Sequence, residues 1–323
     1  MWKAELHLHL EGAAKPALVE RLARRHGVDV SRIIQDGEYV WHDFTSFLNA
    51  YDMAASVFRT AEDYTLLAYE TFSGLAAQNC LYGEVFLSPS HAETVGLAYV
   101  DMVAAVAEGL DHARRETGIE GRFIPIIVRH LGPETAINVA ELVVENPHPL
   151  VTGFGMAGDE RAFEVEEFTE AFELAADAGL GLTAHAGEFL GPDSIRGVLD
   201  HLGVTRIGHG VRAVEDAGLM HQLARDGVVL EMCPGSNVAL GVTKRWAEHR
   251  LPRFLDAGIP VTLNSDDPPF FHTTLTHEYE MAAEYLRMRP HDLTECTRTA
   301  LEAAFVDEAT RRKLLKRLEK PPV

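Results

Sequence analysis

The sequence predicts an α/β protein with a (β/α)8 TIM-type barrel, a helical insertion after the first strand and extra helices at the C-terminus. About eight short apolar segments alternate with helical patterns along the 323 residues. In the second half, four helical patterns each end in a glycine that directly precedes such a segment. Glycine commonly adopts the left-handed conformation after a helix, and nearly continuous apolar strands are typical of buried parallel sheets. The length and the strand number favour a closed barrel over an open doubly wound sheet.

The first predicted strand lies in the stretch Lys3–Gly12 and contains His7 and His9. Residues two apart in a strand project from the same face, so the two imidazoles stand side by side. An isolated His-x-His more often reflects alternation with leucine than a metal site. The interpretation therefore depends on whether the rest of the chain supplies further ligands.

A long helical region is predicted next. Residues 15–26 show a helical pattern that ends at Gly27, and residues 27–79 look helical and amphipathic, without a strong strand. A long excursion after the first strand, with helices of its own, is more typical of a cap than of a disordered linker. We therefore expect residues of about 11–79 to form a helical cap or lid.

The remaining elements follow in regular order. Strands are predicted at residues 81–87, 122–128, 150–154, 180–185, 204–209, 228–233 and 259–266. The clearest helices between them are predicted at 99–116, 133–145 and 164–178, and C-terminal helices at about 275–320. No linker or low-complexity segment interrupts this order, so residues 1–323 are expected to form a single domain.

The composition restricts the class of protein and its partners. The chain is 46% hydrophobic, yet it has no run near the roughly 20 apolar residues that a membrane span requires. Its net charge of −20 disfavours nucleic acid and anionic membranes, because both need a positive surface. Three widely spaced cysteines and the lack of a signal-peptide pattern predict a protein of the reducing cytoplasm. We expect a small-molecule partner; the oligomeric state has no signal in the sequence.

Polar residues gather where the predicted strands end. These residues are His7, His9, His185, Glu188, His209, Asp266 and Asp267. The carboxyl ends of barrel strands form one rim, where catalytic residues of such barrels lie. A single buried histidine is usually a core residue, but packing alone explains four histidines and two aspartates on one rim poorly. The set therefore predicts a functional site.

Three histidines and one carboxylate form a suitable ligand set for one Zn²⁺ with an open position for water. The candidate ligands are His7, His9, His185 and Asp266. Such an ion lowers the pKa of its water to about 7 and supplies hydroxide at neutral pH. Barrel hydrolases with two metals often bridge them with a lysine on the fourth strand, and this chain has no lysine there. One metal per chain is therefore expected.

Three further residues are candidates for catalysis. Glu188 follows His185 by three residues and is suited to act as an acid or base beside the metal. His209 is suited either to assist the hydroxide or to stabilise developing charge. Asp267 is expected to be protonated or paired with a substrate donor, because adjacent carboxylates resist sharing full charge. No G-x-S-x-G motif occurs, so attack by water is favoured over a serine nucleophile.

Six stretches resemble the adenosine deaminase family of the amidohydrolase superfamily, in the family's order. They are ELHLHLEG (5–12), AGDE (157–160), TAHAGE (183–188), RIGHG (206–210), CPGSN (233–237) and LNSDDP (263–268). The resemblance implies zinc ligands at His7, His9, His185 and Asp266. It implies that Glu188 protonates purine N1 as hydroxide adds at C6, that His209 orients or activates the hydroxide, and that Asp267 contacts N7. The implied substrate-binding residues are His9, Glu11, Gly158 (near N3) and Asp267.

The resemblance leaves the substrate open. The first expectation is conversion of adenosine and 2′-deoxyadenosine to inosine and 2′-deoxyinosine with release of ammonia, because AGDE and Ser88-Pro89 look like the nucleoside-type members. Glu11 and Gly155 depart from that pattern, since adenosine deaminases commonly have Asp at the first position and often an acidic residue at the second. Adenine, an N6-substituted adenine nucleoside and aminodeoxyfutalosine are the alternatives. A non-catalytic purine-binding barrel is a remote one, because no ligand or acid is missing.

Overall fold

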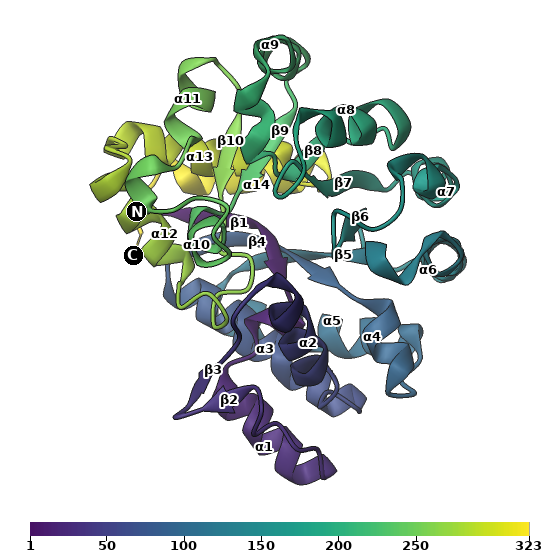
Figure 1. Cartoon of the computed structure of the whole chain (residues 1–323). Coiled ribbons are helices and arrows are strands. Elements are labelled where there is room, and N and C mark those ends of the chain that lie inside the picture. Colours follow the sequence, from purple (N-terminus) through teal and green to yellow (C-terminus); the bar gives the residue numbers. More distant parts are fainter. Residues whose placement is uncertain (323) are drawn as a thin grey trace.

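The computed structural model describes residues 1–322 and confirms the predicted (β/α)8 barrel (Figure 1). Eight parallel strands form one sheet in the order β1-β4-β5-β6-β7-β8-β9-β10, with helices around the outside. The barrel closes where β1 meets the segment after β10. There the His9 amide donates to the Asp266 carbonyl across 3.1 Å, and the Asp266 amide donates to the His7 carbonyl across 3.0 Å.

The strands of the barrel are short and lie close to their predicted positions. They are β1 (Lys3–His9), β4 (Cys80–Leu87), β5 (Glu120–Val128), β6 (Gly153–Ala157), β7 (Gly181–Ala186), β8 (Arg206–His209), β9 (Val229–Met232) and β10 (Val261–Leu263). The fourth barrel strand, β6, lies three residues later than the predicted 150–154. Val151 makes an isolated bridge to Phe123, and regular pairing begins only afterwards.

The helices follow the strands as the sequence predicts. They are α1 (Pro16–His26), α2 (Phe44–Ala55), α3 (Ala61–Ala77), α4 (Pro89–Thr94), α5 (Tyr99–Thr117), α6 (Pro133–Glu145), α7 (Thr169–Asp177), α8 (Pro192–His201), α9 (Ala217–Asp226), α10 (Pro234–Ala239), α11 (Leu251–Asp256), α12 (Leu275–Tyr285), α13 (Pro290–Ala303) and α14 (Glu308–Leu318). The helix expected at 164–178 begins as a 3₁₀ turn over Val165–Phe168. Gly118, after α5, adopts the left-handed conformation (φ 72°) that ends a helix.

The region between β1 and α3 contains α1, α2 and a short antiparallel hairpin, β2 (Ile34–Gln35) with β3 (Glu38–Tyr39). The sequence did not predict this hairpin, because strands of two residues are too short to show an alternating pattern. Tyr39 attaches it to the barrel: its hydroxyl donates to the Ala14 carbonyl across 2.8 Å, and its ring stacks on Phe270 at 3.7 Å between centroids. Motion of this region as a lid stays a prediction.

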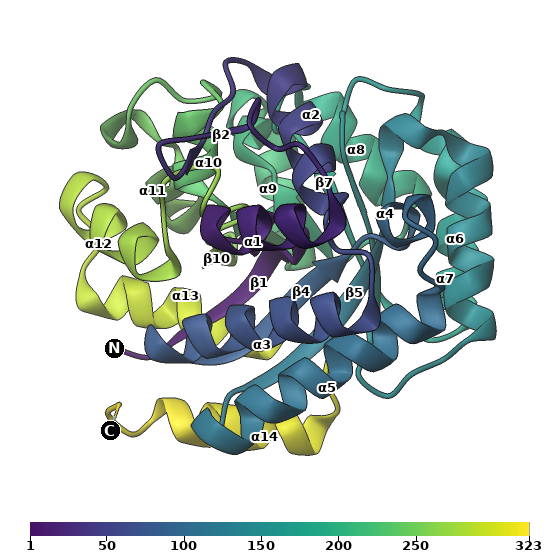
Figure 2. The same ribbon diagram turned by 90° about the horizontal axis from the view of Figure 1, so that it is seen from below.

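Helix α3 packs along α5 on the outside of the barrel (Figure 2). The two helices approach closely at Gly109, where a Cβ atom would lie 2.3 Å from the Thr65 carbonyl oxygen. The C-terminal helices α13 and α14 pack on the first two barrel strands. Their apolar residues form a cluster with these strands, made of Ala4, Leu6, Leu81, Tyr82, Ala300, Leu301, Ala304 and Leu314. Ala4 and Leu6 alternate along β1 with His7 and His9, so this cluster covers the face of β1 opposite the two histidines.

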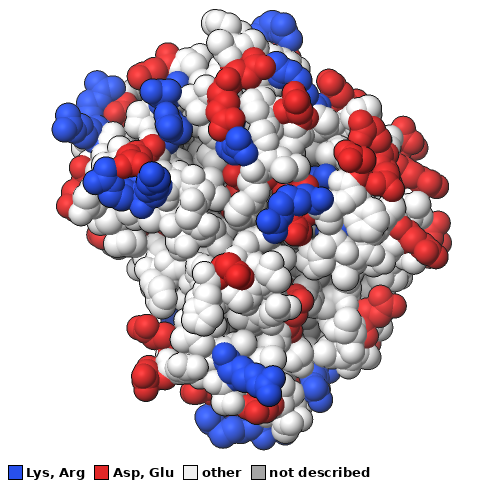
Figure 3. All heavy atoms as spheres, in the orientation of Figure 1, with Lys and Arg blue, Asp and Glu red and all other residues white. Residues whose placement is uncertain are grey.

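The visible face of the molecule carries both charges, with acidic side chains in larger groups than basic ones (Figure 3). This distribution agrees with the net charge of −20. Along residues 1–322, no helix combines the length and the apolar composition that crossing a membrane requires. All three cysteines, Cys80, Cys233 and Cys296, are buried free thiols.

Candidate active site

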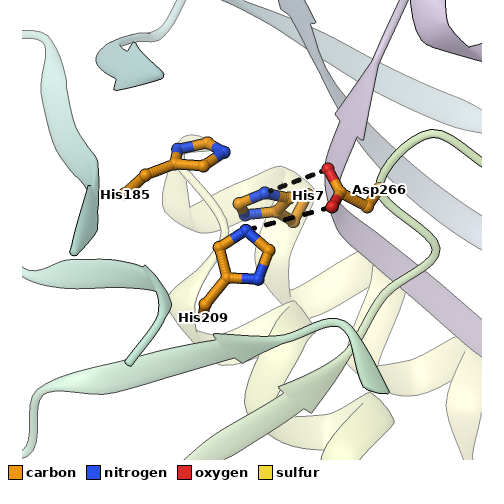
Figure 4. Close-up of side chains that lie close together, drawn as sticks. All are labelled: His7, His185, His209 and Asp266. Atoms are coloured by element: carbon orange, nitrogen blue, oxygen red, sulfur yellow. Dashed lines mark ion pairs between the residues drawn. The ribbon is translucent and has the colours of Figure 1, made fainter. Parts of the chain in front are cut away.

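The carboxyl ends of three strands and the loop after β10 bring four side chains together (Figure 4). His7 comes from β1, His185 from β7, His209 from β8, and Asp266 follows β10. His7 Nε2 lies 3.5 Å from Asp266 Oδ1, and His209 Nε2 lies 3.9 Å from Asp266 Oδ2. The sequence predicted that these residues share one rim, and the structure brings them together there.

His9 joins this group from the same face of β1. Its Nε2 lies 3.3 Å from His185 Nε2 and 3.4 Å from Asp266 Oδ1. In a tetrahedral zinc site with metal–ligand distances of about 2.0–2.2 Å, neighbouring ligand atoms lie about 3.3–3.6 Å apart. The spacing between the nitrogens of His7, His9 and His185 and the Asp266 oxygen therefore fits a zinc ion, as do three nitrogens and one oxygen as donors.

Two of the histidines are held so that Nε2 is free to bind a metal. His7 donates through Nδ1 to Glu231 across 2.8 Å, and its buried Nε2 has no hydrogen-bond partner among the described residues. His185 donates through Nδ1 to the Met156 carbonyl across 2.8 Å. A donor at Nδ1 leaves a lone pair on Nε2 in a neutral imidazole. His185 is in this form, because burial lowers its pKa well below the usual value. Burial also disfavours a charged His7, but the carboxylates of Asp266 and Glu231 raise its pKa to about 10 in the metal-free protein, so a metal ion at its Nε2 would replace a proton.

The backbone at the site is strained in two places. His209 and Asp266 both adopt left-handed conformations, with φ of 62° and 63°. Such conformations cost of order 1–3 kcal/mol in residues other than glycine and cluster at functional sites. Gly208 lies between the rings of His7 and His185, and a Cβ atom there would come within 2.6 Å of the His7 ring. Only glycine fits at this position of β8.

Glu188 lies in the loop after β7 and lines the cavity. The buried Glu160 carboxylate fixes this loop: it accepts the amides of Phe189 and Leu190 across 2.7 and 2.9 Å, together with the Gly187 amide and the Ser194 hydroxyl. Glu188 Oε1 is buried without a hydrogen-bond partner in the described chain. Burial, helped by the nearby Asp266, raises the pKa of Glu188 well above its usual value. Burial therefore favours the protonated form of Glu188, which lines the cavity.

Asp267 is a second buried acid at the same cavity. Its Oδ1 is buried and, within residues 1–322, has no hydrogen-bond partner. Burial and then the adjacent Asp266 raise its pKa well above the usual value for an aspartate. Gly12 approaches it so closely that a Cβ atom would lie 1.6 Å from Asp267 Oδ1. The first loop of the chain thus fixes the Asp267 side chain in place.

His209 is fully enclosed by protein. Burial lowers its pKa to about 3, so the ring is neutral at pH 7. Its Nδ1 lies 3.2 Å from Asn237 Nδ2 and 3.6 Å from Glu188 Oε1. The ring therefore lies between the buried acid Glu188 and the candidate metal ligand Asp266.

The cavity above these residues contains about 590 Å³ of space, part of it open to solvent. Its floor carries His9, His185, Glu188, His209, Asp266 and Asp267. Its walls are mostly apolar or aromatic and come from α2 and the barrel rim: Phe44, Phe47, Leu48, Tyr51, Ile126, Val128, Ala157, Leu240 and Phe271. Gly158 lines it as the sequence predicted. A flat, mostly apolar ring with polar edges suits such a cavity.

Glu11 lies behind the cavity wall and is not one of the cavity-lining residues. Its buried carboxylate accepts hydrogen bonds from Tyr51 and Tyr64, each across 3.2 Å. Tyr51, in contrast, lines the cavity. The structure thus places Glu11 one layer behind the cavity surface, where its bonded partner Tyr51 lines the cavity.

Several buried charged residues around the site were missed by the sequence analysis. Arg206 pairs with Glu231 (2.7 Å) and with Glu84 (2.6 Å) in the barrel interior, and its guanidinium lies over the Phe305 ring. Burial opposes the charge of Glu231, but Arg206 and His7 hold its pKa below the usual value. One feature of the sequence could have identified these residues: each of the strands β4, β8 and β9 is mostly apolar but contains one acidic or arginine residue.

Comparison with known proteins agrees with this site. Residues 2–321 match the family model described as adenosine deaminase. An adenine deaminase from Sinorhizobium medicae is 53% identical over 313 residues, which is 97% of each chain. The crystal structure of an adenine deaminase from Arthrobacter aurescens superposes with a TM-score of 0.92 at 30% identity, covering 98% of both chains. An amidohydrolase from Burkholderia ambifaria with bound zinc superposes with a TM-score of 0.90 at 26% identity, covering 99% of this chain and 90% of the other. The chain belongs to the adenosine deaminase family.

Proposed function

We propose that the protein is a zinc-dependent adenine deaminase, which converts adenine and water to hypoxanthine and ammonia. The observation that carries this proposal is the pair of buried carboxyl groups, Glu188 and Asp267, that line one cavity beside the candidate metal ligands. Each has a buried carboxyl oxygen without a partner among the described residues. Unpaired buried polar groups are costly, so both acids are suited to bind a ligand.

The two acids match the purine edge that carries the reacting amino group. In a 6-aminopurine, the amino group on C6 lies between the acceptor nitrogens N1 and N7. Asp267 donates its proton to N7 in a hydrogen bond and orients the ring. Glu188 donates its proton to N1, which makes C6 electron-poor, and the oxygen of water then adds at C6. One proton of that water restores the Glu188 acid and the other passes to the amino group, which leaves as ammonia while the 6-oxo product remains.

The metal belongs to the proposal because the donor atoms fit it. His7, His9, His185 and Asp266 would hold one zinc ion, which supplies an activated water at neutral pH. Support comes from the spacing of the four donor atoms, from the free His7 Nε2, and from the zinc in the amidohydrolase of 26% identity.

The choice of adenine over adenosine rests mainly on the relatives. The sequence analysis placed adenosine first, but relatives 53% and 30% identical to this chain are named adenine deaminases. The cavity lining also contains a polar bridge: His91 Nε2 lies 2.9 Å from Asp52 Oδ1, and His91 Nδ1 lies 2.6 Å from Ser88 Oγ. This bridge links α2 to α4.

A spectrophotometric assay tests the proposal. Zinc-loaded protein is mixed with adenine, adenosine, 2′-deoxyadenosine and 5′-modified adenine nucleosides, and loss of the 6-aminopurine absorbance is followed. We expect turnover with adenine well above that with the nucleosides. Turnover of a nucleoside in preference to adenine would reject the substrate, and turnover of none would reject the function.

A further inference from the structure

A chain of buried hydrogen bonds leads from the protein surface to His209, and its direction is fixed at its outer end. His249 precedes α11, and its Nδ1 lies 3.2 Å from the backbone amide of Leu251. A backbone amide can only donate, so His249 Nδ1 is the acceptor. His249 is buried and uncharged in this arrangement, because a charged imidazole has no lone pair to accept with. Its proton is therefore on Nε2.

The next residue in the chain is Asn237, on α10. His249 Nε2 lies 3.2 Å from Asn237 Oδ1, so the imidazole donates and the amide oxygen accepts. This contact fixes the orientation of the Asn237 amide, with its nitrogen on the other side. Asn237 Nδ2 lies 3.2 Å from His209 Nδ1, and an amide nitrogen can only donate.

The consequence is a single protonation state for His209. Its Nδ1 accepts from Asn237 and carries no proton, so the proton of the neutral ring is on Nε2. The opposite orientation of the Asn237 amide is impossible. It would require His249 to accept hydrogen bonds at both ring nitrogens, and a neutral imidazole has only one acceptor nitrogen. Glu188 Oε1, at 3.6 Å from the same Nδ1, is farther away than Asn237 Nδ2.

We infer that Asn237 and His249 are positioning residues that fix His209 as a neutral hydrogen-bond donor through Nε2. His209 Nε2 faces Asp266 across 3.9 Å, on the side of the candidate metal ligands (Figure 4). The catalytic part of this inference rests on the proposed function. In the proposed reaction, the Nε2 proton stabilises negative charge on the oxygen that adds at C6. His209 does not take the proton of water, because its free lone pair is already used by Asn237. This decides between the two roles that the sequence left open.

The direct test is the protonation state of His209 in the zinc-loaded protein. Nitrogen-15 NMR distinguishes protonated from unprotonated imidazole nitrogens, and the His209 signals are assigned by their loss in His209→Gln. We expect a protonated Nε2 and an unprotonated Nδ1 at pH 7. A proton on Nδ1 would overturn the inference, whichever substrate the enzyme uses.

Substitutions in the chain test its effect on turnover. Asn237→Asp keeps the shape but replaces the donor with an acceptor, so it should place a proton on Nδ1 and lower kcat by about a hundredfold or more, with a smaller change in KM. His249→Leu leaves the Asn237 amide unoriented and should also lower kcat. His249→Gln can still donate to Asn237 and should retain more of kcat than His249→Leu. A purely structural role would give the two His249 variants equal losses.

His148 provides a matched control. Its Nδ1 also accepts the backbone amide two residues later, from Leu150 across 3.2 Å, but it lies in the loop between α6 and β6 and does not line the cavity. His148→Leu should leave the His209 signals and kcat unchanged. If Asn237→Asp and His249→Leu are folded, bind zinc and keep the kcat of the wild type, the inference is wrong. If the wild-type protein does not deaminate adenine, the proposed function fails, while the NMR result still decides the state of His209.

Discussion

The imidazole of His7 donates through Nδ1 to Glu231 across 2.8 Å, between two side chains without solvent exposure. Glu231 is in turn held by Arg206, so the orientation of His7 depends on a charge pair in the barrel interior. Partners of this kind fix the ring orientation of a metal-binding histidine and raise its basicity. The proposed zinc site therefore depends on Glu231 and Arg206, which hold His7 in position, as well as on the residues that provide the donor atoms.

Glu231→Gln should weaken zinc binding by about 10–100-fold. The glutamine amide is a poorer hydrogen-bond acceptor for His7 than the carboxylate, and the substitution removes the negative charge that pairs with Arg206. The dissociation constant is measured by competition with a coloured chelator. Glu116→Gln, which changes an exposed residue bonded to Tyr69, is the control. An unchanged zinc affinity in folded Glu231→Gln would show that Glu231 does not support the metal site.

Glu188→Gln should keep the fold and the zinc content and lower kcat by about 10²–10⁴-fold, because the amide has the same shape but no acidic proton. Metal analysis and steady-state kinetics check both parts. A variant with wild-type kcat would remove Glu188 from the mechanism.

The pH dependence of the wild type tests the same residue. Burial raises the pKa of Glu188 well above its usual value, which extends the pH range over which it holds the proton that it donates. As the pH rises through this raised pKa the acid is lost, and kcat/KM for adenine should fall on the alkaline side. A kcat/KM that instead rises steadily into the alkaline range would show that Glu188 acts as a carboxylate.

The bridge between Asp52 and His91 is expected to affect the choice between base and nucleoside. With N1 at Glu188 and N7 at Asp267, N9 of the purine faces away from the floor, and the bridge belongs to the rest of the cavity lining. Asp52→Ala should therefore raise the ratio of kcat/KM for adenosine to that for adenine by about tenfold. His112→Ala, which removes an exposed histidine near Glu108 on α5, should leave the ratio unchanged. A ratio within about twofold of the wild type in Asp52→Ala would contradict this role.

Glu278 makes the stability of the protein depend on pH. The buried carboxyl accepts from the Gly235 amide and the Thr273 hydroxyl, and burial raises its pKa from 4.5 to about 8. The unfolded chain releases this proton near pH 4.5 and the folded chain near pH 8, so stability should fall as the pH rises between these values. Glu278→Gln keeps the shape and removes the charge.

The Glu278→Gln variant should therefore gain thermal stability over the wild type as the pH is raised from 5 to about 8, with little difference at the acid end. Melting temperatures across this range measure the effect. Glu280→Gln, at an exposed position of the same helix α12, is the control. A Tm difference that is independent of pH would mean that Glu278 is already ionised in the folded protein.

The sequence predicted the barrel because its signals are local. Each apolar segment reports a buried strand, and glycines such as Gly118 report the end of a helix. The hairpin β2–β3 was missed because four paired residues leave no pattern. The seven polar residues of the rim were found for a related reason: each lies near the end of a strand or in the loop just after it, and barrel topology places all strand ends together.

The supporting residues could not be found in the same way. Glu84, Arg206 and Glu231 lie 25 to 147 positions apart in the chain and pair only because the closed barrel brings their strands together. Glu11 was assigned to the substrate by the resemblance to the adenosine deaminase family. The chain turns into a 3₁₀ helix at Glu11, which directs its carboxylate to Tyr51 and Tyr64 instead of the cavity. The roles assigned to the rim residues stay predictions.

Competition between two substrates tests the central proposal most directly. Zinc-loaded protein is given equal concentrations of adenine and adenosine in one reaction, and hypoxanthine and inosine are separated and quantified at early times. The proposed function predicts that hypoxanthine accumulates first, while adenosine remains. Inosine accumulating first would contradict it and would return adenosine as the substrate.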